Sequence, residues 1–530
     1  MLKHNSRLEL SQYASNERKG ERKLPILALV FFLVIALIAT NNAILNYIRD
    51  HQNHTDHPAL GIGVTKTSDG EYIGLSDGTF AFDTNRADGA LKLQAADALK
   101  NGKIANAISL WQSGIRQDSS DAEPLIYLED LRVLASGHPY ITLVVGTFFD
   151  PADVSVGRGD LQGAYVVQKE YNDGFKLPAG TQVRILVANT GNLATYAKPV
   201  AQQIVQAAQT DRTILGVMGW PYSSRTLNAI NILAAAHIPM VSQTATSALL
   251  TGISPYFFRV APPDTSQAAA GARYVEQTLH DKAVALFEDP TDSYSKSFGE
   301  AFKRQFTADG NSIVVTEPYT VDKPETLASR LQDALTHNPD SIYFSGYWPD
   351  VSVLLSDLPT SGQFANLLVM GGDGLYVLGG YSQEAHANLG RLRFTALAYP
   401  DEWDVQHLTA QKPPFFRDYP EHFDPGGAPH LSPYGYSRPD SEVMLAFDAT
   451  FALLEGCRIA LTSGKRNISS DDLRHALTTI TGSNAIQGVS GQIAFGPDGN
   501  PVDKAVVVLA VTQDGRFQMQ GVQGTFLKRS

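Results

Sequence analysis

The sequence predicts an α/β protein of two lobes, each a parallel sheet flanked by helices, preceded by one transmembrane helix and a small helical hairpin. Three observations lead to this fold class. From Pro139 onward, short apolar, β-branched runs alternate with helical patterns, which is typical of parallel sheets covered on both faces. The alternation continues to the C-terminal part of a 530-residue chain, more than one such sheet usually holds, so two lobes are expected. Finally, residues 24–40 carry no charge.

The uncharged run predicts a membrane-spanning segment. Uncharged residues continue to Ile48, and a helix of that length reaches ~37 Å, more than the ~30 Å hydrocarbon core of a bilayer. Basic residues crowd positions 18–23, so the positive-inside rule places residues 1–23 in the cytoplasm as a short tail. The sequence therefore predicts a single-pass protein with a signal anchor at residues 24–48 and an extracytoplasmic C-terminal domain.

A cleaved signal peptide is the alternative interpretation of this segment. Ala36 and Ala39 are small residues that can precede a cleavage site. The long charged leader, the pair Asn41 and Asn42, and the continued lack of charge favour an uncleaved anchor.

The composition narrows the range of partners. A formal net charge of −12 disfavours nucleic acid and anionic lipid, which leaves small or neutral partners. A hydrophobic content of 43% with 18% charged residues fits an exported globular chain. Cys457 is the single cysteine, so no intramolecular disulfide forms and core burial must hold the fold.

Two smaller elements are expected between the membrane and the first strand of the domain. Residues 49–88 are polar and rich in Gly, Asp, Thr and His, which predicts a partly ordered linker. Residues 89–137 predict a helical hairpin, because apolar residues between Ile104 and Trp111 share one helical face and Asp121 is placed to cap a second amphipathic helix. The hairpin resembles tetratricopeptide-type repeats but is too short to stack into a solenoid, so we expect a spacer or docking element.

The remaining residues, 138–530, are expected to form the two-lobed domain. The apolar runs predict strands at residues 141–145, 183–188, 214–219, 283–287, 312–315, 341–344 and 367–370. The helical patterns between them include residues 190–209, 226–236 and 326–335. A Pro-, Gly- and aromatic-rich insert at residues 399–439 has no period, which predicts a surface loop over one lobe.

Hydroxyl-rich loops follow two neighbouring strands of the expected sheet. Ser223 comes after the strand at residues 214–219 and begins a helix, and Thr244 and Thr246 follow the next strand. In α/β sheets ligands bind beyond the carboxyl ends of the strands. Hydroxyl groups beside free N–H groups at a helix N-terminus can bind an anion such as a carboxylate. The alternative, that Ser223 only caps its helix, stays open.

Longer stretches of the chain resemble a known family. The segments that carry the likeness are 219–229 (Gly-Trp-Pro-Tyr-Ser-Ser-Arg-Thr-Leu-Asn-Ala), 235–246 (Ala-Ala-His-Ile-Pro-Met-Val-Ser-Gln-Thr-Ala-Thr) and 256–267 (Tyr-Phe-Phe-Arg-Val-Ala-Pro-Pro-Asp-Thr-Ser-Gln), with shorter motifs at 157–164, 344–350, 371–375, 447–449 and 488–495. They resemble the type I periplasmic binding proteins of the leucine/isoleucine/valine-binding branch, which are substrate-binding proteins of branched-chain amino acid ABC transporters. Each motif is weak alone, but their collinear order over residues 139–518 is specific.

The resemblance implies a set of ligand-binding residues. Ser223 would bind the α-carboxylate of an amino acid, together with the Thr244 main chain and the Thr246 hydroxyl. Asp373 would pair with the α-ammonium from the opposite lobe, where the family usually has glutamate; the shorter side chain leaves room for a water or a bulkier amine. Gly-Gly-Asp-Gly is also a plain turn sequence, which is the alternative for Asp373. The other residues that would line the cleft are Tyr294, Tyr347 and Arg158.

The resemblance also implies where the chain crosses between the lobes. Lobe 1 would comprise about residues 138–261 and 393–483, and lobe 2 about residues 262–392 and 484–530. The hinge strands would lie near residues 260–263, 392–394 and 482–488.

The sequence contains none of the common motifs for catalysis, cofactors or metals. There is no Walker-type loop, no paired cysteine motif, no His-Glu-x-x-His and no Gly-x-Ser-x-Gly. We therefore expect neither enzymatic activity nor a cofactor nor a bound metal.

The expected function is that of a membrane-tethered extracytoplasmic solute-binding protein. It would capture an amino acid or a similar small zwitterion by closing its cleft, and deliver it to an ABC-type permease. The alternative is the ligand-sensing ectodomain of a signalling system, in which the helical hairpin and membrane helix relay closure inward. The tail at residues 1–23 is too short to hold a kinase or a DNA-binding domain, which favours transport.

Overall fold

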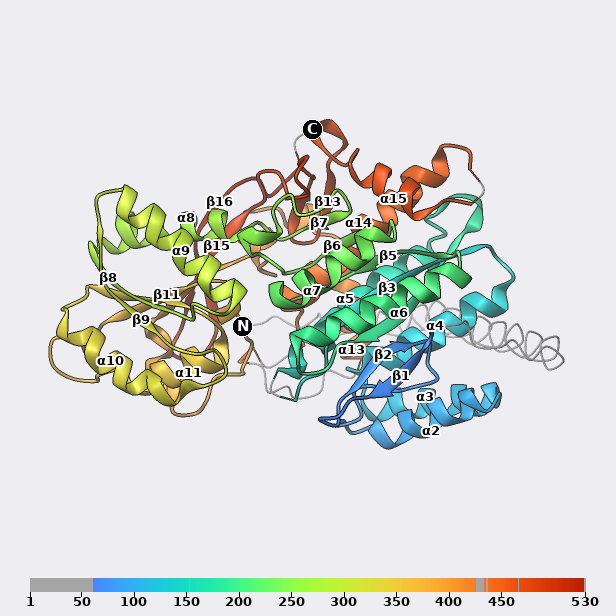
Figure 1. The fold of residues 1–530 in the computed structure, drawn as a ribbon, viewed down its shortest axis with the longest axis horizontal. Helices are drawn as coiled ribbons and strands as arrows, with labels where there is room; N and C mark the ends of the chain where they lie inside the picture. The colour runs from blue at the N-terminus through green and yellow to red at the C-terminus, as the bar shows by residue number, and fades with distance from the viewer. Residues whose placement is uncertain (1–60, 152, 426–432, 435–436, 466, 529–530) are drawn as a thin grey trace, which may run out of the picture.

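The computed structural model describes residues 61–528 apart from residues 152, 426–432, 435–436 and 466. The expected cytoplasmic tail, the anchor at residues 24–48 and the first part of the linker lie outside the described residues. Within the described part, no helix is both long enough and apolar enough to cross a bilayer. Figure 1 shows two lobes, each built around one sheet.

A seven-stranded sheet forms the centre of lobe 1. Its strands, in spatial order, are β1 (Gly63–Lys66), β2 (Tyr72–Ser76), β4 (Gln182–Asn189), β3 (Tyr140–Thr147), β5 (Ile214–Met218), β6 (Met240–Ser242) and β7 (Phe257–Arg259). From β4 to β7 all neighbouring strands are parallel, as the alternation of strands and helices predicts.

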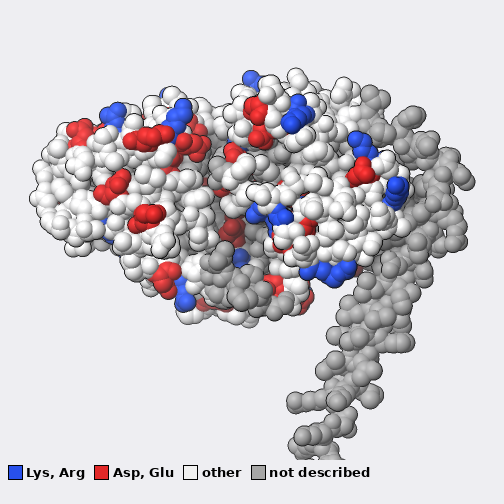
Figure 2. Space-filling model, turned by 90° about the horizontal axis from the view of Figure 1, so that it is seen from below, with Lys and Arg blue, Asp and Glu red and all other residues white. Residues whose placement is uncertain are grey.

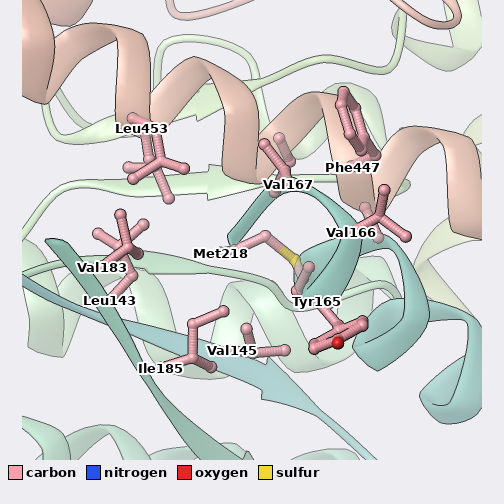
Figure 3. Packing of buried hydrophobic residues seen from close by; sticks show 14 of the residues in the cluster. Leu143, Val145, Tyr165, Val166, Val167, Val183, Ile185, Met218, Phe447 and Leu453 are labelled. Carbon is pink, nitrogen blue, oxygen red and sulfur yellow. The ribbon is translucent and has the colours of Figure 1, made fainter. Parts of the chain in front are cut away.

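Helices cover both faces of this sheet. The helices on the first face are α5 (Val154–Asp173), α14 (Ser441–Thr462) and α15 (Ser470–Leu477), and those on the second are α6 (Ala197–Thr210) and α7 (Ser223–Ala235). Successive strand residues point to opposite faces, so Leu143 and Val145 pack under α5 and α14 while Val144 packs under α6 and α7. Figure 3 shows the first of these clusters, with Phe447 of α14 over the strands.

A second seven-stranded sheet forms lobe 2. Its strands, in spatial order, are β16 (Phe517–Gln523), β15 (Val506–Val511), β12 (Leu392–Ala396), β11 (Leu368–Gly371), β10 (Ser341–Ser345), β8 (Ala283–Glu288) and β9 (Ser312–Pro318). Neighbouring strands are parallel from β9 through β8, β10 and β11 to β12. Strand β15 pairs antiparallel with β12 on one side and with β16 on the other. One face of the sheet is covered by α8 (Asp264–Tyr274) and α9 (Ser293–Ala308). The other face is covered by α10 (Leu327–Thr336) and α11 (Trp348–Ser356).

Shorter elements connect these layers. A two-stranded sheet consists of β13 (Ile486–Gly488) and β14 (Gly491–Ile493). Single-turn 3-10 helices occur at Pro178–Gly180, Ala194–Tyr196, Ala248–Leu250, Pro324–Thr326, Asp373–Leu375, Thr409–Gln411 and Gly482–Asn484, with a longer one at Ala385–Arg391, and a π-helical turn, Val275–Leu279, continues α8.

The chain crosses between the lobes at places that differ in part from the expected ones. The first crossing, at residues 260–263, joins β7 to α8 as expected. The second does not lie at residues 392–394, because β12 is hydrogen-bonded between β11 and β15 inside the lobe 2 sheet. Val489 and Ile493, expected in lobe 2, pack in the core of lobe 1, so the chain returns to lobe 2 only with β15.

The described part of the expected linker is folded into lobe 1. Strands β1 and β2 form a hairpin, and β2 pairs antiparallel with β4, with Leu75 opposite Ala188. The side chains of Ile73 and Leu75 are buried in the core under α6. Because alternate residues of this polar segment supply an apolar face, the segment extends the sheet instead of acting as a spacer.

Residues 89–137 form three helices and not a two-helix hairpin. They are α2 (Gly89–Lys100), α3 (Ile104–Gln117) and α4 (Ala122–Ser136). Asp121 caps α4 as predicted, accepting a hydrogen bond from the Glu123 N–H at 2.9 Å. Trp111 and Ile126 are buried in the same apolar cluster as α5 and β4, so these helices are part of lobe 1.

The aromatic insert at residues 399–439 also packs against the domain. It contains α12 (Glu402–Val405) and α13 (Phe415–Phe423). The side chains of Phe415 and Phe423 join the core of lobe 1, and the buried Trp403 donates a hydrogen bond to the Val489 carbonyl at 2.8 Å. The insert is therefore not a simple surface loop, because its aromatic residues have apolar partners on lobe 1.

Candidate functional site

A cavity of about 120 Å³ lies between the two lobes. Lobe 1 contributes the loop before α5, the loop that leads into α7, the loop after β6 and the start of α14. Lobe 2 contributes the starts of α9 and α11 and the turn after β11. Most of these segments follow the carboxyl end of a parallel strand, which is where α/β folds place their ligands.

Ser223 lies on the lobe 1 side of the cavity, as the first residue of α7. Its Oγ accepts a hydrogen bond at 3.1 Å from the N–H of Ser247, a residue outside α7, which leaves the hydroxyl proton available to a group in the cavity. The preceding turn requires glycine at position 219, where φ is +135° and a Cβ atom would overlap the Gly146 carbonyl.

Thr244 lies beside Ser223 in the cavity wall. Its hydroxyl is within hydrogen-bonding distance of the Pro221 carbonyl oxygen (3.0 Å) and of Oε1 of Glu442 (3.2 Å). Ser223 and Thr244 therefore bring two hydroxyl groups from neighbouring strand ends to one wall, as the sequence predicts.

Asp373 faces the same cavity from lobe 2. It begins the 3-10 turn after β11 and accepts a hydrogen bond from the Tyr294 hydroxyl at 3.0 Å. Burial raises the pKa of Asp373 to about 6, although hydrogen bonds from Gln267 and Tyr294 act in the opposite direction. The carboxylate is thus a buried acceptor, and none of the contacts that lower its pKa comes from a cation.

The position of Tyr294 depends on the start of α9. Asp292 caps this helix by accepting hydrogen bonds from the N–H groups of Tyr294 (3.0 Å) and Ser295 (2.8 Å). The Tyr294 hydroxyl in turn accepts a hydrogen bond from the Gly374 N–H at 3.0 Å. The helix cap and the turn after β11 are therefore joined through one tyrosine, which orients Asp373.

Aromatic side chains from both lobes meet across the cavity. The ring of Tyr347 lies 5.1 Å from that of Tyr294 in its own lobe and 5.1 Å from that of Tyr222 in lobe 1, centroid to centroid. The Trp348 indole N–H donates to Oδ1 of Asp153 at 3.4 Å, which is a second contact between the lobes. Tyr294 and Tyr347 thus line the cavity as expected.

Two of the expected site residues do not line the cavity. Thr246 is buried beside Asp264, away from the lining. Arg158 forms an ion pair with Asp83, with Nε 2.7 Å from Oδ2 and Nη2 3.1 Å from Oδ1. Arg158 is directed away from the cleft because the segment before α2 covers this side of α5 and offers a buried carboxylate.

Several lining residues were not predicted from the sequence. Asp153 accepts hydrogen bonds from the Tyr222 hydroxyl and from Ser155 Oγ (3.1 Å), and burial raises its pKa to about 6. Asp153 follows the first strand of the domain, so the rule that ligands bind beyond strand ends could have found it. Glu442 lies on α14, a helix far along the chain, and no local signal marks it.

The outer surface differs from the cavity in its charge. On the face in Figure 2, acidic and basic side chains are interspersed over both lobes, with broad uncharged areas between them. Among the described residues, no group of His, Cys, Asp and Glu side chains is arranged to hold a metal ion. The cavity, with hydroxyl groups on one wall and a carboxylate on the other, can hold a small polar ligand.

Comparison with known proteins identifies the architecture. The family model described as "Periplasmic binding protein" matches residues 149–516. The Leu/Ile/Val-binding protein BraC3 of Rhizobium johnstonii is 32% identical over 163 residues, which are 30% of this chain and 42% of that protein. The leucine-specific-binding protein of Salmonella typhimurium is 26% identical over 212 residues, 39% of this chain and 49% of that protein. The matches thus span less than half the length of these relatives.

Solved structures of low identity share the fold. The substrate-binding protein LivJ of Streptococcus pneumoniae, in complex with isoleucine, has a TM-score of 0.60 at 19% identity and covers 73% of this chain and 99% of its own. The leucine-binding protein LivK of Thermotoga maritima has a TM-score of 0.59 at 21% identity, with coverages of 72% and 99%. A solute-binding protein from R. palustris in complex with 4-hydroxybenzoate has a TM-score of 0.59 at 16% identity, with coverages of 73% and 98%. The two sheets of parallel strands flanked by helices are thus the type I periplasmic-binding fold.

Proposed function

Since the chain belongs to the periplasmic binding protein family, whose model matches residues 149–516, we propose that it captures an amino acid or a similar small zwitterion between its two lobes. Like its relatives, the chain is a solute-binding protein and not an enzyme. The relatives named for leucine, isoleucine and valine support an amino acid as the solute.

One observation carries the proposal: a hydroxyl group at the start of α7 on lobe 1 and a carboxylate on lobe 2 face one cavity. Ser223 and the main chain of Thr244 would hold the carboxylate of the solute, and Asp373 would hold its ammonium group. Charge-assisted hydrogen bonds of this kind are about twice as strong as neutral ones. A zwitterion therefore gains most when both lobes contact it at once.

This arrangement couples binding to closure. A ligand shifts a two-state protein toward the closed state only by the contacts that it makes there and not in the open state. The second set of contacts, from lobe 2, is available only when the lobes approach. The crossings between the lobes, such as residues 260–263, would absorb the rotation.

We further propose that residues 24–48 tether the protein to the membrane and that it delivers its solute to an ABC-type permease. The charge-free segment and the basic residues before it support an anchor with the domain outside the cytoplasm. The family supports an extracytoplasmic domain and a permease as partner.

A sensor ectodomain is the second candidate, and the contact between Arg158 and Asp83 favours it. Ser155 and Val156 at the start of α5 line the cavity, and Arg158 on the same helix binds Asp83 in the segment before α2. The N-terminal helices are thus in direct contact with the helix that begins at the ligand, which would let them relay closure toward the membrane.

Titration calorimetry of the full-length protein against the common amino acids tests the proposal. We expect at least one of them to bind with micromolar or tighter affinity. Ser223→Ala should weaken that binding by about 1–3 kcal/mol, because the ligand carboxylate loses a buried donor.

Ser224→Ala is the matched control, since Ser224 is the next residue of α7 and does not line the cavity. It should bind like the unaltered protein. Equal affinity for both variants would refute the site, and the failure of every amino acid to bind would refute the proposed solute class.

A further inference from the structure

The cavity has more carboxyl groups than a simple zwitterion can pair with. Asp153, Asp373, Asp440 and Glu442 line it, and none of the described residues in its lining is Lys, Arg or His. Asp440 caps α14 through the Val443 N–H at 3.0 Å and so has a structural role. If Asp373 binds the ammonium group of an amino acid, Asp153 and Glu442 still face the cavity without a cation.

The hydrogen-bond partners of Asp153 and Glu442 are all neutral or acidic. Asp153 accepts from Tyr222, from Ser155 and, across the cleft, from the Trp348 indole. Glu442 accepts from Thr244 at 3.2 Å and is hydrogen-bonded to the buried Asp160. A buried carboxylate without a cation is costly, so these two side chains leave an unmet demand for positive charge.

Asp160 does not meet that demand, because it is itself acidic and is hydrogen-bonded to Glu442, with which it shares a proton. Thr147 donates to it at 2.6 Å and Gln243 at 2.8 Å. Burial, and then the charge of Asp160, raises the pKa of Glu442 well above its usual value. Burial likewise raises the pKa of Asp153 to about 6. Both directions are those of carboxylates that lack a cationic partner.

The arginine residues nearest to the cavity are engaged elsewhere. Arg225 donates to the carbonyl oxygens of Gly191 (2.9 Å) and Asn192 (3.1 Å) and lies over the ring of Phe148. Arg158 pairs with Asp83 as described above, and Arg438 pairs with Asp401 at 3.0 Å. The protein therefore does not supply the missing cation from these side chains.

The aromatic lining offers an independent indication of a cationic ligand. Tyr222, Tyr347 and Trp348 lie around the cavity, and ring faces attract ammonium and guanidinium groups. The hydroxyl oxygen of Tyr376, which also lines the cavity, is buried and has no hydrogen-bond partner among the described residues. It can accept a hydrogen bond from a cationic N–H group.

Resting on the proposed function, we infer that the solute is a basic amino acid, with Asp373 binding its α-ammonium and Asp153 and Glu442 binding the cation at the end of its side chain. Tyr222, whose hydroxyl donates to Asp153, lines the same cavity as Glu442. The second cation would take the place of the protons that these carboxyl groups hold, which the apolar side chains of leucine, isoleucine and valine cannot do.

The test compares L-lysine with L-norleucine by titration calorimetry on the full-length protein. The two amino acids have side chains of similar length, but norleucine lacks the terminal ammonium group. We expect lysine, ornithine or arginine to bind at least about tenfold more tightly than norleucine and leucine, because the basic side chain forms one additional desolvated ion pair.

Norleucine or leucine binding as tightly as every basic amino acid would overturn this inference and leave the proposed function intact. If no amino acid of either class binds, the proposed function fails, and this inference fails with it. The comparison uses only the unaltered protein, so it does not depend on whether a variant folds.

Two variants test whether Asp153 and Glu442 bind the cation at the end of the ligand side chain. Asp153→Asn and Glu442→Gln should each weaken lysine binding by about tenfold and change norleucine binding by less than about twofold. Asp357→Asn, at an exposed position at the end of α11, is the control and should alter neither. Equal losses for lysine and norleucine would show that these residues only shape the cavity, which overturns their assignment.

Discussion

At the scale of single residues, the protonation of Asp373 should control binding. Burial raises the pKa of Asp373 to about 6, and the pKa of Asp153 is also raised to about 6 by burial. An ammonium group binds the ionised carboxylate, so these two groups should make their full contribution to the affinity above pH ~7. It should fall as the pH drops through 6, by about tenfold per pH unit for each proton that must be displaced.

Calorimetry between pH 4.5 and 7.5 checks this prediction. The Asp373→Asn variant should bind more weakly at every pH and show a shallower slope, because one titrating group has been removed. Constant affinity of the unaltered protein over this range would contradict a role for these carboxylates in binding.

At the same scale, Arg158 illustrates why some residues could not be placed from the sequence. Its position in the chain matches a cleft residue of the family, yet its guanidinium binds Asp83, whose side chain is only 4% exposed. A long side chain at a helix start can reach either the cleft or the neighbouring segment. Which of the two it reaches depends on how the segment that precedes the domain folds.

At the scale of elements, the close packing of α5 against α14 depends on Gly163. A Cβ atom at this position would overlap the Val443 carbonyl oxygen and lie 2.6 Å from the Phe447 nitrogen, so the two helix backbones would have to separate. We expect Gly163→Ala to lower the free energy of unfolding by about 1–3 kcal/mol, because overpacking outweighs the better helix propensity of alanine.

Gly159→Ala, one helical turn earlier, is the matched control. A Cβ atom there would come no closer than 3.4 Å to Glu442 and Val443. Denaturant unfolding should show Gly159→Ala to be as stable as the unaltered protein or more stable by up to about 1 kcal/mol. Equal effects of the two substitutions would contradict the packing that the structure shows between α5 and α14.

At the scale of the whole molecule, the N-terminal elements are part of lobe 1. We expect deletion of residues 61–136 from the full chain to give a protein that is insoluble or has a strongly lowered melting temperature. The deletion would expose the edge of β4, which β2 now covers, together with apolar surface that packs against Trp111 and Ile126.

Soluble yield and differential scanning calorimetry measure this effect. Trp111→Ala, which removes one buried side chain of the same cluster, should destabilise the chain by only about 3–5 kcal/mol and is the graded comparison. A deleted protein with the melting temperature of the full chain would mean that residues 138–530 form an independent domain, as expected from the sequence.

Much of the architecture follows from the sequence alone. The alternation of strands and helices, the two lobes, the capping of α4 by Asp121, and the positions of Ser223, Thr244 and Asp373 at the ends of strands were all predictable. Each depends on a period, a cap or a turn within a few residues, and such signals are local in the chain.

Only the tertiary structure decided the rest. It joined β2 to β4, directed Arg158 to Asp83, and brought Asp153 and Glu442 to one cavity although hundreds of residues separate them. These contacts depend on which surfaces are free once the sheets and helices have packed, and no local pattern records that. The cluster of carboxyl groups in the cleft is therefore a property of the folded molecule, because each of them comes from a separate segment.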